Sequence, residues 1–392
     1  MGLPVLTDTD IRDLVAEVFG LKVTSSKRLD GYDDVNYHVK VSPTSQNAHF
    51  LSLSEDGYIL KIGNPNVSSN LDNIDAQNAM MMYLNENLSN VEVSLPLPST
   101  RGNYKEVVNV PLHENVDPLN GDAPPLKVVV RMLTFIKGTT MFHVKSEPGR
   151  EVLISIGRLT GQLIHSLKGF DHPGVITAKE FRWSLENAPD VEDKMHAVDD
   201  PNQRGCFSQV LADFEDMKKK WCDKCPQGII FGDLNEGNIF LEELPVSCWD
   251  SAEYYVKGIV DFADHHRCCS VFELALSMCY MMLESCRKGT VRPIEAGGLV
   301  LAGYLQSNTL TEGEQHMLKI SIEARCVQSL VMGQYSFKYI YPDNLYVLNT
   351  QTSGWQVLQQ LRQLTAKELW SIWDQVLSAV NTTDGTLTND HH

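Results

Sequence analysis

Long apolar runs are missing from the sequence. The most apolar helical stretch, residues 271–283, holds 13 residues and includes Glu273, whereas a transmembrane helix needs about 20 apolar residues. The first residues show neither a basic region nor an extended apolar stretch, so we expect no secretory signal and no membrane contact. The nine cysteines are odd in number and irregularly spaced, which is typical of reduced thiols and not of a disulfide framework. We therefore expect a cytoplasmic protein.

Basic residues are also scarce. The chain has 33 Lys and Arg against 50 Asp and Glu, which gives a formal net charge of -17. Such an acidic surface repels nucleic-acid phosphates and anionic lipids, so the sequence predicts neither nucleic acid nor a membrane as a partner. Hydrophobic residues make up 43% and charged residues 21%. These fractions are typical of globular proteins and exclude a globally disordered, collagen-like or coiled-coil chain.

Hydrophobic periodicity predicts an α+β protein with two lobes. The order is a capped helix over 7–20, strands, one further helix and strands again, which indicates a small lobe with an antiparallel sheet. Helices dominate from Gly138 onward, so we place an N-terminal lobe at 1–137, a C-terminal lobe at 138–380 and a disordered tail at 381–392. The predicted strands are 21–29, 35–41, 58–62, 91–98 and 127–136, and the later helices are 72–88, 149–168, 205–221, 270–288, 293–306, 311–340 with a break, and 353–380.

Two segments of the second lobe carry residues suited to chemistry. An apolar run leads into Asp233, Asn238 follows five positions later, and a second apolar run ends at Asp261. Each half alone is an ordinary strand end, but the two in this order after a β-rich lobe are typical of a kinase. Phosphoryl transfer needs a carboxylate beside the acceptor hydroxyl and oxygen ligands for Mg²⁺. We therefore predict Asp233 as the catalytic base and Asn238 and Asp261 as metal ligands.

Lys61 lies inside the apolar strand 58–62. This placement favours a lysine that binds nucleotide phosphates, and the alternative is an edge-strand lysine whose ammonium reaches solvent. In kinases a helix acid holds this lysine, and the helix from residue 72 offers Asp75 or Gln77. The sequence does not decide between these two partners.

The loop at 29–37 is the candidate cover for the phosphates. It contains one glycine, Gly31, and so departs from the usual glycine-rich pattern, although backbone amides beside it could meet a phosphate. Asp33 and Asp34 would repel phosphates there unless they face a metal or a cationic substrate. Gly31 and Asp34 are counted with Lys61 as candidate nucleotide-binding residues. The alternative interpretation is a solvated turn.

The segments GDLNEGNI and IVDFADHH resemble the aminoglycoside phosphotransferase and choline kinase superfamily. Within it, the chain from about 10 to 365 is similar to the hydroxylysine kinase family, in segments such as GYDDVNYHV, VVRMLTFIKG and RCVQSLVMGQYS. The resemblance implies a protein-kinase-like fold of a β-rich and a mostly helical lobe. It also implies transfer of the γ-phosphate of GTP to the hydroxyl of 5-hydroxy-L-lysine, with Mg²⁺, in the cytoplasm. Composition and spacing indicate neither this nucleotide nor this acceptor.

The resemblance also assigns residues. It places the hinge between the lobes at 131–135, where Arg131, Met132 and Leu133 contribute to nucleotide binding, and it makes Asp33 and Asp34 a family feature. An acceptor of net charge +1 calls for acidic groups, an apolar wall, a hydroxyl and a partner for its carboxylate. A core or helix-surface role is the alternative for each of these candidates. They are Asp33, Asp34, Asp264 and Glu284 as acids, Trp183 as wall, Tyr280 as hydroxyl and Arg325 as carboxylate partner.

Two positions depart from the superfamily pattern. Phe231 stands where histidine is usual, and Ala263 where glycine is usual. Neither position makes the chemical contact, so we still expect an active enzyme. The alternatives are a kinase that uses ATP on choline, ethanolamine or an aminoglycoside, and a nucleotide-binding regulator without activity.

The remaining sequence features give little information about function. Cys222 and Cys225 have the spacing of a zinc pair but no second pair at a matching distance, so we expect no zinc site. No long apolar heptad marks a dimer seam, which favours a monomer. Nucleotide preference and acceptor stereochemistry are not readable from the residues.

Overall fold

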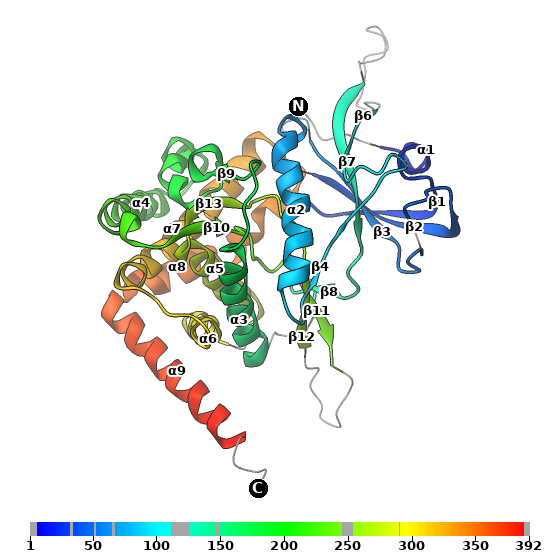
Figure 1. The fold of residues 1–392 in the computed structure, drawn as a ribbon. Helices are drawn as coiled ribbons and strands as arrows, with labels where there is room; N and C mark the ends of the chain where they lie inside the picture. The colour runs from blue at the N-terminus through cyan, green and yellow to red at the C-terminus, as the bar shows by residue number, and fades with distance from the viewer. Residues whose placement is uncertain are drawn as a thin grey trace. The chain divides into compact units, whose positions relative to one another are not determined.

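A computed structural model gives the fold (Figure 1). The chain divides into two compact units, each described below by itself. The first comprises Met1–Glu86, Glu92–Lys137 and His172–Gly174, and the second Asn87–Val91, Gly138–Asp171 and Val175–His392. The residues that the structure describes are 6–31, 34–50, 52–64, 67–110, 125–145, 149–244, 254–289 and 291–387.

The first unit is built on an antiparallel sheet. Its strands follow the order β1-β2-β3-β7-β5, and β6 pairs with the free part of β7. Helix α1 packs along β1, and its capping box at Thr7 and its left-handed end at Gly20 match the signals in the sequence. The elements are α1 Asp8–Phe19, β1 Leu21–Leu29, β2 Val35–Ser45, β3 Tyr58–Ile62, α2 Leu71–Asn87, β4 Glu92–Val93, β5 Pro96–Leu97, β6 Glu106–Val110 and β7 Leu126–Thr134.

The two faces of this sheet differ in polarity. Tyr37 on β2, Leu60 on β3 and Met132 on β7 stand opposite one another and belong to the buried core that α1 covers. Because side chains alternate along a strand, the next row points to the other face. That row consists of Asn36, Lys61 and Arg131, in register across the same three strands. The sheet therefore presents a polar row on the face away from its main core.

The second unit is mostly helical. It also contains the small sheet β10-β13-β9 and a sheet in which β11 pairs with β12 and β8. These strands carry the loops with the predicted catalytic residues. The elements are β8 Thr139–Thr140, α3 Arg150–Leu167, β9 Ile176–Thr177, α4 Pro201–Trp221, β10 Gln227–Ile230, β11 Ile239–Glu243, β12 Tyr254–Ile259, β13 His266–Cys269, α5 Val271–Lys288, α6 Pro293–Leu305, α7 Glu312–Tyr339, α8 Gly354–Gln363 and α9 Ala366–Leu387, with 3-10 segments η3 Leu185–Ala197 and η5 Leu345–Thr352.

Three expectations about helices were wrong in detail. Helix α7 is continuous, although a break was expected within 311–340. Its central polar residues are buried and Arg325 pairs with Gln328 of the same helix at 2.8 Å, so the helix does not need to end there. The expected helix 353–380 is two helices, α8 and α9, and α9 ends at Leu387; the rest of the expected tail, 388–392, lies outside the described residues. The 3-10 segment η3 was not anticipated.

Helices α3 and α6 meet through glycines on both sides. A Cβ on Gly157 would lie 1.8 Å from Val300 O, and a Cβ on Gly303 would lie 1.9 Å from Ile154 O. Backbone therefore packs on backbone at this crossing, and no side chain fits between the helices. Helix α3 is in turn fixed to α5 by the buried Thr160 Oγ1, which donates to Ser277 Oγ at 3.0 Å.

In the part of the chain that the structure describes, none of the helices combines the length and the apolar character needed to cross a bilayer.

We expect Gly303→Ala to lower the free energy of unfolding by at least about 1–3 kcal/mol, because the new methyl group overpacks a backbone contact. Urea or thermal unfolding measures the change. Gly205→Ala in α4 is the matched control, since a Cβ there meets nothing within 4 Å. It should stabilise the protein by about 0.5–1 kcal/mol. Equal effects of the two substitutions would contradict the crossing described above.

Candidate active site

Asp233 lies on the loop between β10 and β11. Gly232 precedes it with φ +86, and a Cβ there would lie 2.4 Å from Asp264 O, so glycine is required. Asn238 Nδ2 donates to Asp233 Oδ2 at 2.8 Å and to Asp233 O at 3.0 Å. Asn235 Oδ1 accepts from the backbone N–H of Asn238 at 3.1 Å. The amide side chains of the loop therefore fix Asp233 and Asn238 as neighbours.

Asp261 follows β12 and reaches the same place. The N–H of Val260 donates to Asn238 O at 3.0 Å, which brings the ends of β11 and β12 together. Asp261 has φ +63, a left-handed conformation that aspartate tolerates better than most residues. Its Oδ1 accepts from the Ala263 N–H at 3.3 Å. The structure thus gathers Asp233, Asn238 and Asp261 at one site.

Arg325 from α7 supplies a positive charge beside Asp233. Its guanidinium Nη2 lies 3.9 Å from Asp233 Oδ1, and its side chain is 2% exposed. Nε donates to Tyr280 Oη at 3.0 Å, and Nη1 donates to Trp183 O at 3.0 Å and to Gln328 Oε1 at 2.8 Å. The rings of Trp183 and Tyr280 lie 5.3 Å and 5.4 Å from the guanidinium carbon. The guanidinium is therefore held in a fixed orientation.

Opposing effects act on the carboxyl of Asp233. Burial raises its pKa, Arg325 lowers it, and the nearby carboxylate of Asp261 raises it, with a net upward direction. Burial lowers the pKa of Arg325, but Tyr280 and the carboxylates of Asp233 and Asp264 raise it. Arg325 thus opposes the effect that would protonate Asp233.

Glu273, in the apolar helix α5, holds the loop from behind. Its Oε2 accepts from the Gly232 N–H at 2.9 Å, and the residue is fully buried. Burial raises the pKa of Glu273 to about 7, against backbone hydrogen bonds from Gly232 and Phe231 that lower it. The sequence placed this glutamate in an apolar helix without assigning it a role. The structure shows that it anchors the residue before Asp233.

Phe231, at the first of the two departures from the superfamily pattern, is fully buried. Its ring meets Phe262 edge-on at 5.0 Å between centroids. Packing of two aromatic rings therefore supports the base of the loop where a histidine is usual.

The remaining predicted substrate residues of this unit have varied surroundings. Trp183 and Tyr280 contact Arg325 as described above. Asp264 lies near enough for its carboxylate to raise the pKa of Arg325. The carboxylate of Glu284 pairs with Arg287 at 2.7 Å and Lys288 at 3.0 Å, and its charge contributes to the raised pKa of Glu236 in the catalytic loop. These two cations also donate to the carbonyls of Met141, Phe142 and Val144.

The predicted phosphate-binding residues belong to the first unit. Lys61 Nζ forms an ion pair with Asp34 Oδ2 at 3.1 Å, and the two side chains are 7% and 8% exposed. Asp75 pairs instead with Lys105, and Gln77 Oε1 accepts from Arg131 Nη2 at 2.8 Å.

The other predicted residues of this unit lie on or beside strands of the same sheet. Gly31 comes just after β1, and Arg131, Met132 and Leu133 lie within β7, before its end. Arg131 is buried and directs its side chain to α2, and Met132 belongs to the core. Asp33 lies outside the described residues.

Two residues near Asp233 were missed. Burial raises the pKa of Glu236 to about 7, and its buried Oε2 has no hydrogen-bond partner among the residues described. Burial and the carboxylates of Glu236, Asp233 and Asp261 raise the pKa of Tyr346, whose hydroxyl lies beside Gly237. Glu236 is inside the motif and was readable as a candidate. Tyr346 comes from η5, far along the chain, and no local pattern indicates it.

Among the described residues, no group of three His, Cys, Asp or Glu side chains could hold a metal ion by itself. The donors at Asn238 and Asp261 are one amide and one carboxylate. Such a set fits Mg²⁺ in a kinase, where waters and substrate phosphates complete the coordination. The amide nitrogen of Asn238 is turned to Asp233, and its amide oxygen is the ligand atom that it would offer.

Comparison with known proteins identifies the family. The profile of the phosphotransferase enzyme family matches residues 30–285. The chain belongs to this family. Hydroxylysine kinase of Bos taurus is 32% identical over 380 residues, which cover 94% of this chain and 93% of the relative. Hydroxylysine kinase of Mus musculus is 32% identical over 377 residues, with the same coverage. The protein is therefore a phosphotransferase that acts on an alcohol group.

Solved structures share the fold at low identity. A microcompartment-associated aminopropanol kinase matches with a TM-score of 0.60 at 14% identity, over 91% of this chain and 98% of that one. An amicoumacin kinase, solved with AMP-PNP, Ca²⁺ and Ami, matches with a TM-score of 0.59 at 14% identity, over 92% and 98%. The predicted protein-kinase-like α+β fold is confirmed.

We expect Glu273→Gln to change how stability depends on pH. The folded pKa of Glu273 is about 7, above its ordinary value of 4.5, so this group makes folding less favourable as pH rises from about 4.5 to 7. Glutamine keeps an acceptor for the Gly232 N–H and does not titrate. Urea unfolding at pH 5 and pH 8 should show the variant gaining stability relative to the parent at the higher pH. A pH-independent difference would contradict this interpretation.

Proposed function

We propose that the protein transfers the γ-phosphate of GTP to the hydroxyl of 5-hydroxy-L-lysine and gives 5-phosphooxy-L-lysine. The observation that carries this proposal is the similarity to hydroxylysine kinases over 94% of the chain. The arrangement around Asp233 supports it, because it offers a base, two oxygen ligands and a cation at one place.

Asp233 is the base of this reaction. It orients the acceptor hydroxyl and takes its proton as the oxygen forms a bond to the γ-phosphorus. The bond from that phosphorus to the oxygen bridging the β-phosphate breaks, and GDP leaves. The Asn238 amide keeps Asp233 Oδ2 in position, and the charge of Arg325 favours the ionised form that a base needs.

Asn238 and Asp261 would hold Mg²⁺ through their side-chain oxygens. When bound, the ion neutralises charge on the phosphates. Lys61 binds phosphate oxygens in the same reaction, and the segment where β7 ends provides backbone groups for the nucleobase. GTP as the donor follows from the family resemblance.

Arg325 is the partner of the acceptor carboxylate. Tyr280, Trp183 and Gln328 use Nε and Nη1, whereas Nη2 lies 3.9 Å from Asp233, beyond hydrogen-bond distance. Nη2 therefore has donors for an anion next to the hydroxyl that Asp233 binds. Asp264 is an acid near the same guanidinium that suits an amine of the acceptor.

Asp233→Asn tests the base. We expect kcat to fall by about 10²–10⁴-fold with little change in stability, because the proton acceptor is lost and the shape is kept. A coupled assay for GDP release with 5-hydroxy-L-lysine measures kcat, and thermal unfolding measures stability. Asp171→Asn is the control, since Asp171 is exposed and pairs with Arg267. Wild-type turnover by the Asp233 variant would contradict the assignment.

Acceptor selection tests Arg325. The parent should prefer 5-hydroxy-L-lysine over 1,5-diaminopentan-2-ol, which lacks only the carboxylate, by about 10–100-fold in kcat/KM, as for one hydrogen bond to a charged group. Arg325→Met should remove this preference, although kcat falls for both acceptors. The acidic limb of its pH–rate profile should move to higher pH, because Arg325 lowers the pKa of Asp233. An unchanged preference would mean that Arg325 does not bind the carboxylate.

Choline, ethanolamine and an aminoglycoside complete the acceptor panel, each with GTP and with ATP. Higher turnover of one of these would overturn the hydroxylysine assignment while leaving the phosphotransferase activity intact. Tight nucleotide binding without product from any acceptor would indicate a regulator.

A further inference from the structure

Lys61 is held by a carboxylate from the loop before β2. Its Nζ lies 3.1 Å from Asp34 Oδ2, and both side chains are almost fully buried. The other oxygen of the same carboxylate accepts from the Asn64 N–H at 3.3 Å. Asp34 is therefore fixed at both oxygens, at the point where the loop enters β2 and next to the polar row of the sheet.

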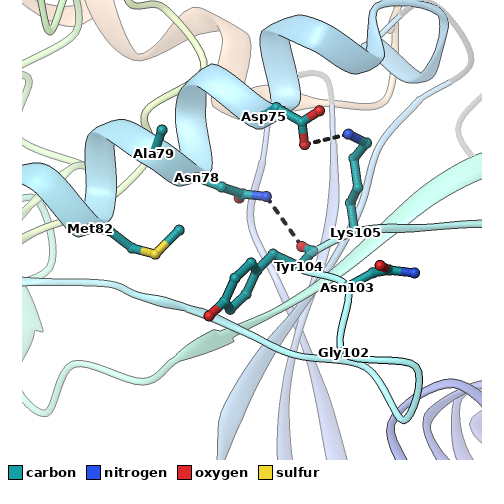
Figure 2. Close-up of a pocket in the computed structure, with 8 residues that line it drawn as sticks. All are labelled: Asp75, Asn78, Ala79, Met82, Gly102, Asn103, Tyr104 and Lys105. Carbon is teal, nitrogen blue, oxygen red and sulfur yellow. Dashed lines mark hydrogen bonds and ion pairs between the residues drawn. The ribbon is translucent and has the colours of Figure 1, made fainter. Parts of the chain in front are cut away.

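Helix α2, the element expected to provide this carboxylate, has its polar side chains engaged elsewhere. Gln77 and Asn78 accept from Arg131 Nη2 at 2.8 Å and Nη1 at 3.0 Å. Asp75 forms its ion pair with Lys105. Figure 2 shows Asp75 turned toward Lys105. Both residues line a pocket of about 460 Å³ between α2 and the residues from Gly102 to Lys105.

The geometry indicates that Asp34 orients the Lys61 side chain and does not merely neutralise its charge. An ammonium has three donors, so it can bind a carboxylate and a phosphate oxygen at the same time. A lysine without such a partner has a flexible four-carbon stem and many rotamers. A buried carboxylate anchored by a backbone N–H removes most of them. The buried oxygen Asn36 Oδ1, across from Lys61 and without a hydrogen-bond partner among the residues described, lies on the same face of the sheet.

We propose that Asp34 is a positioning residue that orients Lys61 toward the nucleotide phosphates, in the role that a helix acid would otherwise have. The inference rests on the proposed function only in that Lys61 binds phosphate. It is independent of the acceptor. It makes the placement of the lysine depend on Asp34, directly before β2, and not on helix α2.

Asp34→Asn tests the inference, with Asp75→Asn as the matched control on the helix. We expect Asp34→Asn to lower kcat/KM for Mg-GTP by about 10²-fold, the loss typical of a misplaced reacting group, with the acceptor KM unchanged. Asp75→Asn should retain wild-type kinetics. Asp34→Glu keeps the charge and should restore part of the loss, which a purely structural role of the loop would not predict.

The same substitution in a Lys61→Met background separates positioning from other effects. With no ammonium to orient, Asp34→Asn should cause no further loss of kcat/KM. An equal loss in both backgrounds, or an equal loss from Asp75→Asn, would overturn the inference. Tighter nucleotide binding by Asp34→Asn would also overturn it, because it would mean that Asp34 only repels phosphate.

Binding of Mg-GTP and Mg-ATP, measured by calorimetry without acceptor, keeps this test apart from the proposed function. If no acceptor turns over, weaker binding by Asp34→Asn in the parent and unchanged binding in Lys61→Met still support the inference. Thermal unfolding checks that each variant is folded. If Asp34→Asn fails to fold, Asp34→Glu in the two backgrounds supplies the same comparison.

Discussion

The hydrogen bond from the Gly232 N–H to Glu273 ties the catalytic loop to the centre of the helical unit. Gly232 has a conformation that only glycine adopts easily, and the next residue is Asp233. Without an anchor this segment would pass from a short strand into an irregular loop with little to fix it. A carboxylate inside an apolar helix is costly, and its retention there is explained by the backbone groups that it satisfies.

Two carboxylates and one guanidinium lie close together beside this anchor. The carboxylates of Asp233 and Asp261 repel each other, and the positive charge of Arg325 offsets the effect of this repulsion on the pKa of Asp233. Arg325 is fixed by two aromatic rings and by carbonyl and amide oxygens, so it cannot turn away as a surface arginine would. A reacting group in such a setting needs little rearrangement when charge develops, which is the condition for electrostatic stabilisation.

Local patterns in the sequence were sufficient for part of the fold and of the site. Asn238 and Asp261 lie beside strand ends that pair directly, and Asp233 is joined to Asn238 across the short loop between them, so their spacing predicted that they would meet. Lys61 was recognisable from its place in an apolar strand. Its contact with Asp34 was not, because that contact depends on the register of β2 against β3, and the helix offered chemically reasonable partners. The position of Tyr346 near Asp233 was not predictable either, because it depends on tertiary packing of η5 against the catalytic loop. The break expected in α7 was wrong, because its polar residues are buried and paired by tertiary packing that the sequence does not show.

The crossing of α3 and α6 has a consequence for motion. Where side chains interdigitate, helices slide past each other by small rotamer changes, which is the basis of shear movements in many enzymes. At Gly157 and Gly303 the carbonyl oxygens of one helix take up the space that such sliding needs. We therefore expect these two helices to move together, and any sliding between packed helices to occur at other contacts.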